Sequence, residues 1–232
     1  MREKEPQKAY EKVTSYIKEE ILSGRIQQGQ RIPPERELAE KLGISRNSVR
    51  EALRTLEVIG LITSTQGAGN SISCNFEENI AQVMSMMFLM HKTDYRELSE
   101  LRSGLEMKAV ELAATYATPR QIDAMEKLVR QLAVSREEDV NVRLDRELHI
   151  SIAQASGNQL IFSNLSALSD VMDAFISSLR KRIYTDDGDR EKLQAYHEQM
   201  IHCLRCRDGK GAREAMACHF QVVDKHLDDV LM

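Results

Sequence analysis

Four side chains in the C-terminal half of this 232-residue sequence have the types and the spacing of a metal site. Asp145 and His149 are four residues apart, so they share one face of a helix. His197 comes 12 residues before Gly209 and His219 comes 10 residues after it, on either side of a turn-forming stretch. At about 1.5 Å of rise per residue, both histidines lie roughly 15–18 Å from the turn. They are therefore expected at the same level of an antiparallel pair of helices.

A carboxylate and three imidazoles suit zinc and other borderline divalent metals, and they leave coordination positions for water or for a ligand carboxylate. On spacing alone the alternative is strong, because histidines in helices are more often ordinary packing or polar residues. The same set also fits a catalytic metal, which needs a general base near a metal-bound water. Glu106 and Glu147 are the candidates for that base, although neither has a diagnostic spacing. A bundle that binds an acyl chain without metal is a third possibility, against which the four residues argue.

Helices must position these side chains, because strand signals vanish after residue 75 and helical periods continue to the end of the sequence. The pattern predicts that residues 76–232 form an all-α bundle of about six or seven helices. The expected helices are 77–91, 95–117, 119–134, 136–156, 158–182, 189–208 and 210–231. Expected N-caps include Asp94, Thr118 and Ser135.

Residues 33–59 have a different pattern, that of two short helices joined by a tight turn. Pro34 suits the first position of the first helix, and Gly43 suits the position just after its end. Ser45 is a good N-cap for the second helix. An earlier apolar-periodic stretch predicts a further helix that ends at Gly24.

The second helix of this pair carries Arg46, Asn47 and Arg50 near its N-terminus, mostly on the face opposite its apolar stripe. Arginine and asparagine make bidentate contacts to base edges and phosphates, and a recognition helix presents them near its N-terminus. An ordinary surface hairpin with solvated arginines is the alternative. The coincidence of turn, cap and basic face favours a helix-turn-helix that binds DNA.

Two short strands are expected after this helix, at 60–64 and 71–73, joined by a turn-rich tip that contains Gly67. A two-stranded wing after a helix-turn-helix is the winged-helix arrangement. Glycine at the tip lets the backbone approach a phosphate or a minor groove closely. The sequence therefore predicts a mainly α protein, with a winged helix-turn-helix in residues 1–75 followed by the all-α bundle.

Charge is unevenly distributed between these two parts. The whole chain has a net charge of −4, but residues 1–75 carry +2 and residues 76–232 carry −6. The DNA-binding part is thus the basic one, although modestly so. No apolar run approaches the ~18 residues of a membrane helix, and no signal-peptide pattern is present, so we expect a cytoplasmic protein without membrane contact.

The four cysteines argue against disulfides in such a compartment. Cys203 and Cys206 have C-x-x-C spacing, which can indicate a thiolate zinc or redox site. No strand or second C-x-x-C accompanies them, so free helical thiols are the preferred interpretation.

Residues 21–24, 28–39 and 43–53 closely resemble the DNA-binding domain of GntR-type bacterial transcriptional regulators. The resemblance covers roughly residues 8–73. It implies an operator contact surface that includes the wing tip in the minor groove and consists of Arg36, Ser45, Arg46, Asn47, Arg50 and Gly67.

The C-terminal part is similar to the FCD-type ligand-binding domain of the FadR subfamily of these regulators. The similarity is carried by residues 145–149, 155–158, 197–219 and the Glu-Leu-Arg run 100–102 with Glu106. Many members bind a divalent metal through one Asp and three His, and sense a small carboxylate. This implies that Asp145, His149, His197 and His219 hold zinc, with nickel or manganese as alternatives. The position before the first metal histidine is usually aromatic, whereas here it is Leu148.

Arg102 is the residue expected to bind the effector, because a guanidinium can clamp a carboxylate bidentately. A salt bridge with Glu106, four residues on, is the alternative. The resemblance as a whole predicts a homodimer on a near-palindromic operator. An organic acid in the bundle is expected to release the protein from DNA, which makes it a repressor.

Overall fold

The computed structural model describes residues 9–65, 67, 69–73, 77–91, 95–171 and 187–227. Two compact units make up the chain, an N-terminal unit of Met1–Asn79 and a C-terminal unit of Ile80–Met232. The domain boundary expected near residue 75 falls within 74–76, outside the described residues. None of the described helices is both long enough and apolar enough to cross a bilayer.

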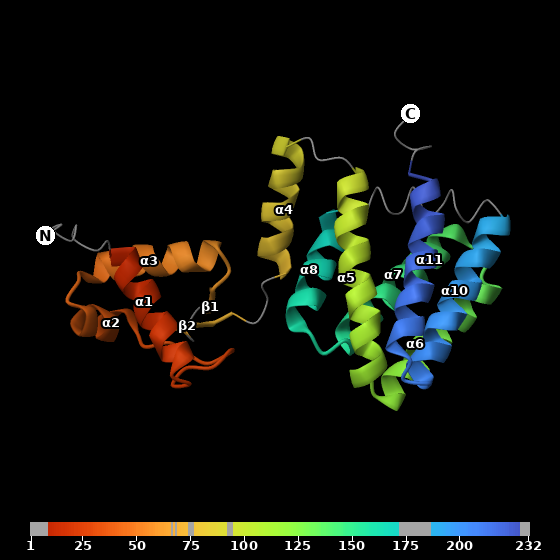
Figure 1. Cartoon of the computed structure of the whole chain (residues 1–232). Coiled ribbons are helices and arrows are strands. Elements are labelled where there is room, and N and C mark those ends of the chain that lie inside the picture. The colour runs from red at the N-terminus through yellow and green to blue at the C-terminus, as the bar shows by residue number, and fades with distance from the viewer. Residues whose placement is uncertain are drawn as a thin grey trace, which may run out of the picture. The chain divides into compact units, whose positions relative to one another are not determined.

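In its described residues before α4 (Glu77–His91), the N-terminal unit has three helices and a small two-stranded sheet (Figure 1). Its elements are α1 (Ala9–Leu22), α2 (Glu35–Leu42), α3 (Arg46–Val58), β1 (Ile62–Thr65) and β2 (Gly69–Ile72). Helix α3 packs against α1, α2 and β1, and the strands pair antiparallel with Ile62 opposite Ile72. Both of these isoleucines are buried in the unit's core, so the wing is anchored at its base by apolar packing.

The expected turn chemistry of the helix-turn-helix is largely confirmed. Gly43 ends α2 in the left-handed conformation, with φ of 62°, which a residue with a side chain rarely adopts. Ser45 N-caps α3, and its side chain accepts a hydrogen bond from the backbone N–H of Ser48 at 3.0 Å. Pro34 differs from the prediction, because it occupies the N-cap of α2 rather than its first position. Its ψ of 152° is extended, and helical geometry begins only at Glu35.

The C-terminal unit is helical throughout its described residues. Its helices, the first of which begins at the end of the N-terminal unit, are α4 (Glu77–His91), α5 (Tyr95–Tyr116), α6 (Pro119–Val134), α7 (Glu138–Ala155), α8 (Gln159–Val171), α10 (Asp187–Arg205) and α11 (Gly209–Lys225). The expected fold class, a winged helix-turn-helix followed by an all-α bundle, is confirmed.

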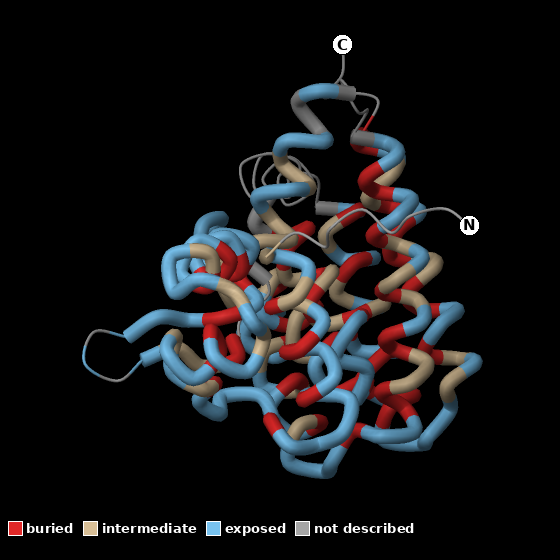
Figure 2. Tube along the Cα trace, turned by 90° about the vertical axis from the view of Figure 1, so that its left-hand side faces the viewer, coloured by how far each residue is buried: buried red, intermediate tan, exposed pale blue. Residues whose placement is uncertain are grey.

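Helix α5 is central to this bundle, because it packs against α7, α8, α10 and α11 (Figure 1). Helix α6 closes the bundle by packing against α7 and α10. Buried positions recur along the bundle helices and alternate with exposed ones (Figure 2), as amphipathic helices around one core require. Much of the core on α5 is alanine, including Ala109, Ala113 and Ala114, so neighbouring helices can approach its axis closely.

Several helix ends agree with the sequence and others do not; α11, for example, ends at Lys225 rather than at residue 231. Thr118 caps α6 through a full capping box with Gln121, as expected. Ser135, expected to cap the next helix, instead ends α6 in an extended conformation, and α7 begins only at Glu138. Helix α10 begins at Asp187, two residues before the expected start. Asp94 and the continuation of α8 beyond Val171 to residue 182 lie outside the described residues.

Candidate functional site

Helix α7 presents Asp145 and His149 from one inward face. Leu148 and Ile152 on the same helix are almost completely buried in the core, so packing fixes the rotation of α7 about its axis. Leu148 thus fills the place where an aromatic side chain is usual in the resembling family. The change affects packing and leaves both polar side chains directed into the bundle.

The hairpin of α10 and α11 supplies the two remaining histidines, His197 and His219. Asp208 caps α11 by accepting a hydrogen bond from the N–H of Gly211 at 2.9 Å. Arg207 adopts a positive φ of 58° in the turn and donates to backbone carbonyls at the end of α5. The two imidazole centroids are 4.9 Å apart, as expected for residues at one level of an antiparallel hairpin.

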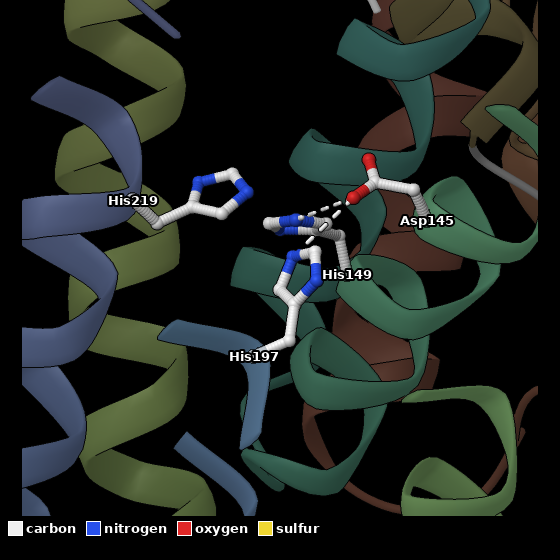
Figure 3. Close-up of side chains that lie close together, drawn as sticks. All are labelled: Asp145, His149, His197 and His219. Atoms are coloured by element: carbon white, nitrogen blue, oxygen red, sulfur yellow. Dashed lines mark ion pairs between the residues drawn. The ribbon is translucent and has the colours of Figure 1, made fainter. Parts of the chain in front are cut away.

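The four side chains from these three helices converge on one point (Figure 3). A ligand atom from each lies within 4.8 Å of those of the others, close to the spacing of about 3–4 Å around an ion with bonds of about 2.0–2.2 Å. Each residue is only 1–4% exposed, so water competes little for these groups. A cluster of this kind, one carboxylate and three imidazoles, is a donor set that suits zinc.

The hydrogen bonding of the cluster is consistent with a metal site. Oδ1 of Asp145 lies 3.3 Å from Nε2 of His197 and 3.8 Å from Nε2 of His149. Within the described part of the chain, Nε2 of His149 and both ring nitrogens of His219 are buried without a hydrogen-bond partner. Buried polar atoms without partners are costly, and an ion bound between these groups would satisfy them. The residues present therefore fit a divalent metal.

Electrostatics favour the neutral form of His219, which is the form that binds metals. Burial lowers the pKa of His219 well below its ordinary value of 6.5, and the neighbouring His149 and His197 lower it further. A neutral imidazole at physiological pH needs no deprotonation before it binds an ion.

Glu106 and Arg102 on α5 extend this cluster. Nε of Arg102 donates to Oε1 of Glu106 at 2.5 Å, while Oε2 of Glu106 bonds to Nδ1 of His149. Burial alone would raise the pKa of Glu106, but the charges of Arg102 and His149 and their hydrogen bonds lower it to about 2. The guanidinium of Arg102 also lies 5.4 Å from the ring centroid of Phe220, the residue after His219. The salt bridge weighed as the alternative for Arg102 is thus present, and effector binding by Arg102 stays a prediction.

The two candidate general bases are poorly suited to catalysis. Both carboxylate oxygens of Glu106 are engaged by Arg102 and His149. Glu147 is exposed on α7, next to the fully buried Leu148. Neither side chain is therefore available to take a proton from a water bound inside the cluster.

Sequence reasoning missed two features near the cluster. The first is the contact of Glu106 with His149, since the sequence showed only that Arg102 and Glu106 share a face of α5. The second is Asn141, one helical turn before Asp145, which is 1% exposed and whose Oδ1 has no hydrogen-bond partner among the described residues. The four-residue spacing from Asn141 to Asp145 was the available signal.

The remaining histidines and cysteines lie outside the cluster. His202 is exposed, and His226 bonds to Asp189 at 2.9 Å. The side chain of His91 and the whole of Cys74 are not among the described residues. Cys203, Cys206 and Cys218 are free thiols, as expected, and burial raises the pKa of Cys203, which makes its thiolate scarce.

The expected DNA-contacting residues lie on the surface of the N-terminal unit. Arg36, Ser45, Arg46, Asn47 and Arg50 are all exposed. Arg50 is held by Glu35 of α2 through both carboxylate oxygens, with Nη2 to Oε2 at 2.8 Å. Arg36 approaches Glu40 at 3.9 Å, a weak pairing between two largely exposed side chains.

Gly67 stands exposed in the turn between β1 and β2. Its φ of 77° lies in the left-handed region that favours glycine. Residues 66 and 68 on either side lie outside the described residues.

Comparison with protein families decides the class of the molecule. Residues 9–72 match the model of the gntR family of bacterial regulatory proteins, and residues 97–222 match the FCD domain, over more than half of the chain. The chain belongs to the GntR family. GntR regulators bind operator DNA and typically dimerise, so this member is a DNA-binding transcriptional regulator with an FCD domain.

Individual relatives agree with this assignment. This GntR-family chain is 29% identical to the putative L-lactate dehydrogenase operon regulatory protein of Escherichia coli K12, over 94% of the chain and 86% of that protein. It is 27% identical to the Glc operon transcriptional activator of the same organism, over 95% of the chain and 89% of the activator. The solved structure of a GntR protein from Streptococcus agalactiae matches 93% of the chain and 99% of its own, with a TM-score of 0.67 and 28% identity. These relatives are regulators, and the expectation that the protein is a regulator and not an enzyme is confirmed.

Proposed function

We propose that this GntR-family regulator senses a small organic acid at a divalent metal site in its helical domain, and that the acid controls operator binding. One observation carries the proposal. A buried aspartate and three buried histidines from three helices bring their ligand atoms within 4.8 Å of one another. The proposed metal ligands are Asp145, His149, His197 and His219.

Zinc is the proposed metal, with nickel or manganese as alternatives. Imidazole and carboxylate donors suit zinc, and four protein ligands leave it able to accept a further oxygen from a small molecule. When bound, the ion supplies positive charge and an open coordination position for a carboxylate. Among the described residues, Arg102 is the proposed second anchor of that carboxylate, because its contact with Glu106 uses Nε and leaves the two terminal amino groups outside that bond.

A 2-hydroxy acid is the proposed class of effector, with L-lactate as the first probe. One relative is named for an L-lactate dehydrogenase operon. A hydroxyl next to a carboxylate can also donate a hydrogen bond, and the buried Oδ1 of Asn141 is an acceptor one turn from Asp145.

Residues 1–75 are the proposed DNA-binding domain and residues 76–232 the proposed effector domain. We propose that α3 enters the major groove with Arg46, Asn47 and Arg50, while Arg36 and Ser45 lie beside the phosphates and Gly67 reaches the minor groove. A homodimer would place one such surface on each half-site of an operator. Ligand control requires that the acid bind the DNA-competent and DNA-released arrangements with different affinity. We propose that it favours release, so that the protein is a repressor.

The test uses the full-length zinc-loaded protein and a panel of 2-hydroxy acids that begins with L-lactate. An operator fragment is first selected from a random DNA pool by the wild-type protein. At least one acid should bind by calorimetry and should change operator affinity by about 5- to 150-fold. Arg102→Ala should still bind DNA but should neither bind nor respond to that acid.

Two results would overturn the proposal. One is a purified protein that holds no divalent metal and takes up none when zinc is added. The other is an acid that binds tightly but has equal affinity with and without operator DNA, because ligand and operator must affect each other by the same factor.

A further inference from the structure

Glu106 lies between the proposed acid anchor and one of the proposed metal ligands. Its Oε1 accepts a hydrogen bond from Nε of Arg102, the proposed acid anchor, and its Oε2 bonds to Nδ1 of His149, a proposed metal ligand. The side chains of all three residues are less than a tenth exposed. One buried carboxylate therefore contacts an acid-binding group with one oxygen and a metal-binding group with the other.

The contact with His149 determines which nitrogen of its ring faces the cluster. An imidazole whose Nδ1–H donates to a carboxylate presents the lone pair of Nε2. Nε2 of His149 is the nitrogen that lies 3.8 Å from Oδ1 of Asp145, and it has no hydrogen-bond partner in the described part of the chain. Carboxylate contacts of this kind orient a ligating histidine and increase its basicity.

The hydrogen bond to Glu106 restrains the guanidinium of Arg102, and the ring of Phe220, whose centroid lies 5.4 Å away, packs near it as well. A flexible arginine loses rotamer freedom when it binds a carboxylate, whereas a restrained one has already lost it. Phe220 also follows His219 directly in α11, so Glu106 and Phe220 each adjoin a proposed metal ligand.

We propose that Glu106 is a positioning residue shared by the metal site and the acid site. It orients His149 for the metal and Arg102 for the acid, and it contacts neither the metal ion nor the acid itself. The inference rests on the proposed function, since it takes His149 as a metal ligand. Its consequence is that loss of the Glu106 carboxylate weakens metal binding, although Glu106 is not itself one of the metal ligands.

Glu106→Gln is the decisive variant, because it keeps the shape and removes one acceptor. His149 and Arg102 both donate to the carboxylate, but a glutamine offers a single acceptor oxygen and places an NH₂ group opposite the other donor. If the NH₂ group faces His149, Nδ1 must become the acceptor and Nε2 carries the proton, which blocks ligation. Arg102 has only donors and cannot make the same switch, so the NH₂ group is expected to face His149.

Zinc affinity is measured by competition with a chromogenic chelator, with zinc alone as the probe. Glu106→Gln should bind zinc about 10–100-fold more weakly than the wild type. Arg102→Met breaks the same buried ion pair but keeps the bond between Glu106 and His149, so it should lower zinc affinity by a clearly smaller factor. Glu111→Gln is the matched control with wild-type affinity expected, since Glu111 is a partly exposed carboxylate on α5 that pairs with Lys108 at 3.2 Å.

A second measurement does not depend on any variant folding. Nitrogen-15 spectra of the zinc-free wild type should show the His149 ring protonated on Nδ1, the tautomer that donates to Glu106. Protonation on Nε2 instead would overturn the inference.

Two further results would also overturn it. Wild-type zinc affinity in Glu106→Gln would show that His149 needs no support from Glu106. Equal losses in Glu106→Gln and Arg102→Met would show that the broken ion pair, and not the lost acceptor, weakens the site. A wild type that binds no zinc would overturn the proposed function itself, and is distinguished from these results because it requires no variant.

Discussion

The two units carry their proposed functional residues in opposite ways. In the N-terminal unit the residues expected to contact DNA are exposed and come mainly from one helix and its preceding turn. In the C-terminal unit the proposed metal ligands are buried and come from α7, α10 and α11, with support from α5. A surface made by one helix is specified locally, whereas a buried cluster exists only when several helices have packed in register.

The difference has an energetic counterpart. Exposed arginines contribute little to folding and can be replaced without loss of structure. Buried histidines and carboxylates are costly to desolvate, so the stability of the bundle depends on what satisfies them. Function and stability are therefore expected to separate cleanly in the first unit and to be linked in the second.

The largest expected effect is the loss of the metal in His219→Ala. The wild type should hold about one divalent ion per chain, and the variant should hold little, because one of four ligands is missing. Removal of the ion by a chelator should lower the melting temperature of the wild type and leave that of the variant almost unchanged. Plasma mass spectrometry and calorimetry check both points. Normal metal content in His219→Ala would remove this histidine from the site.

Changes on α3 should affect mainly DNA binding. Arg46→Ala and Arg50→Ala are each expected to weaken binding to the selected operator by roughly 5- to 150-fold, if these side chains reach bases. Metal content should stay at the wild-type value, and the melting temperature should fall by a few degrees at most in Arg50→Ala, which loses its pair with Glu35. Fluorescence anisotropy measures the affinity. Full-strength operator binding by the double variant would mean that another element reads the DNA.

Mild acid should destabilise the zinc-free C-terminal unit before the N-terminal one. The pKa of His219 is lowered by burial in the folded protein, so the unfolded chain binds its proton at higher pH than the folded chain does. The stability that this histidine contributes is complete above its ordinary value of 6.5 and declines as pH falls below it. The N-terminal unit contains no histidine, and its Glu35, whose pKa is lowered by the hydrogen bonds from Arg50, keeps its stabilising contribution until the pH falls to about 4.5 and below.

Scanning calorimetry in the presence of a chelator at pH 7.5 and pH 5.5 tests this comparison. The transition of the bundle should move to lower temperature at the lower pH, while that of the winged helix stays in place. Parallel shifts of both transitions would contradict the assignment of the effect to the buried histidine.

The smallest expected effect is that of Glu35→Ala on stability. The pair of Glu35 and Arg50 is bidentate, but their side chains are 27% and 45% exposed, so solvent screens it. The melting temperature of the N-terminal unit should fall by a few degrees at most. A fall comparable to the one caused by chelation in the C-terminal unit would remove the proposed contrast between the units.

The features that the sequence predicts are mainly local ones. The turn at Gly43, the cap at Ser45 and the capping box at Thr118 are local features, and each is recognisable from residue types a few positions apart. Ser135 shows the limit of such signals, because a serine between two helices can end the first as readily as begin the second. Pro34 shows a second limit of local signals, because a proline fits the N-cap as well as the first helical position.

For the cluster, helical rise gave the level of His197 and His219 correctly, because both are counted from one turn. The contact of Glu106 with His149 could not be predicted by counting residues along a helix. It depends on how α5 is rotated against α7, which is set by the packing of small residues such as Ala109 and Ala113 along the whole helix. Periodicity tells which residues share a face but not which face of another helix they meet.

The turn between α10 and α11 determines how far along their helices His197 and His219 lie. Arg207 holds the turn against the end of α5, and Asp208 caps the start of α11. Because the turn is held in place, the number of residues between it and each histidine sets the position of that histidine in the bundle. One residue inserted after Asp208 would advance His219 by about 1.5 Å and rotate it by about 100° around its helix. Loops usually tolerate changes of length, yet this one should not, because an insertion that leaves the bundle folded would turn a metal ligand away from its partners.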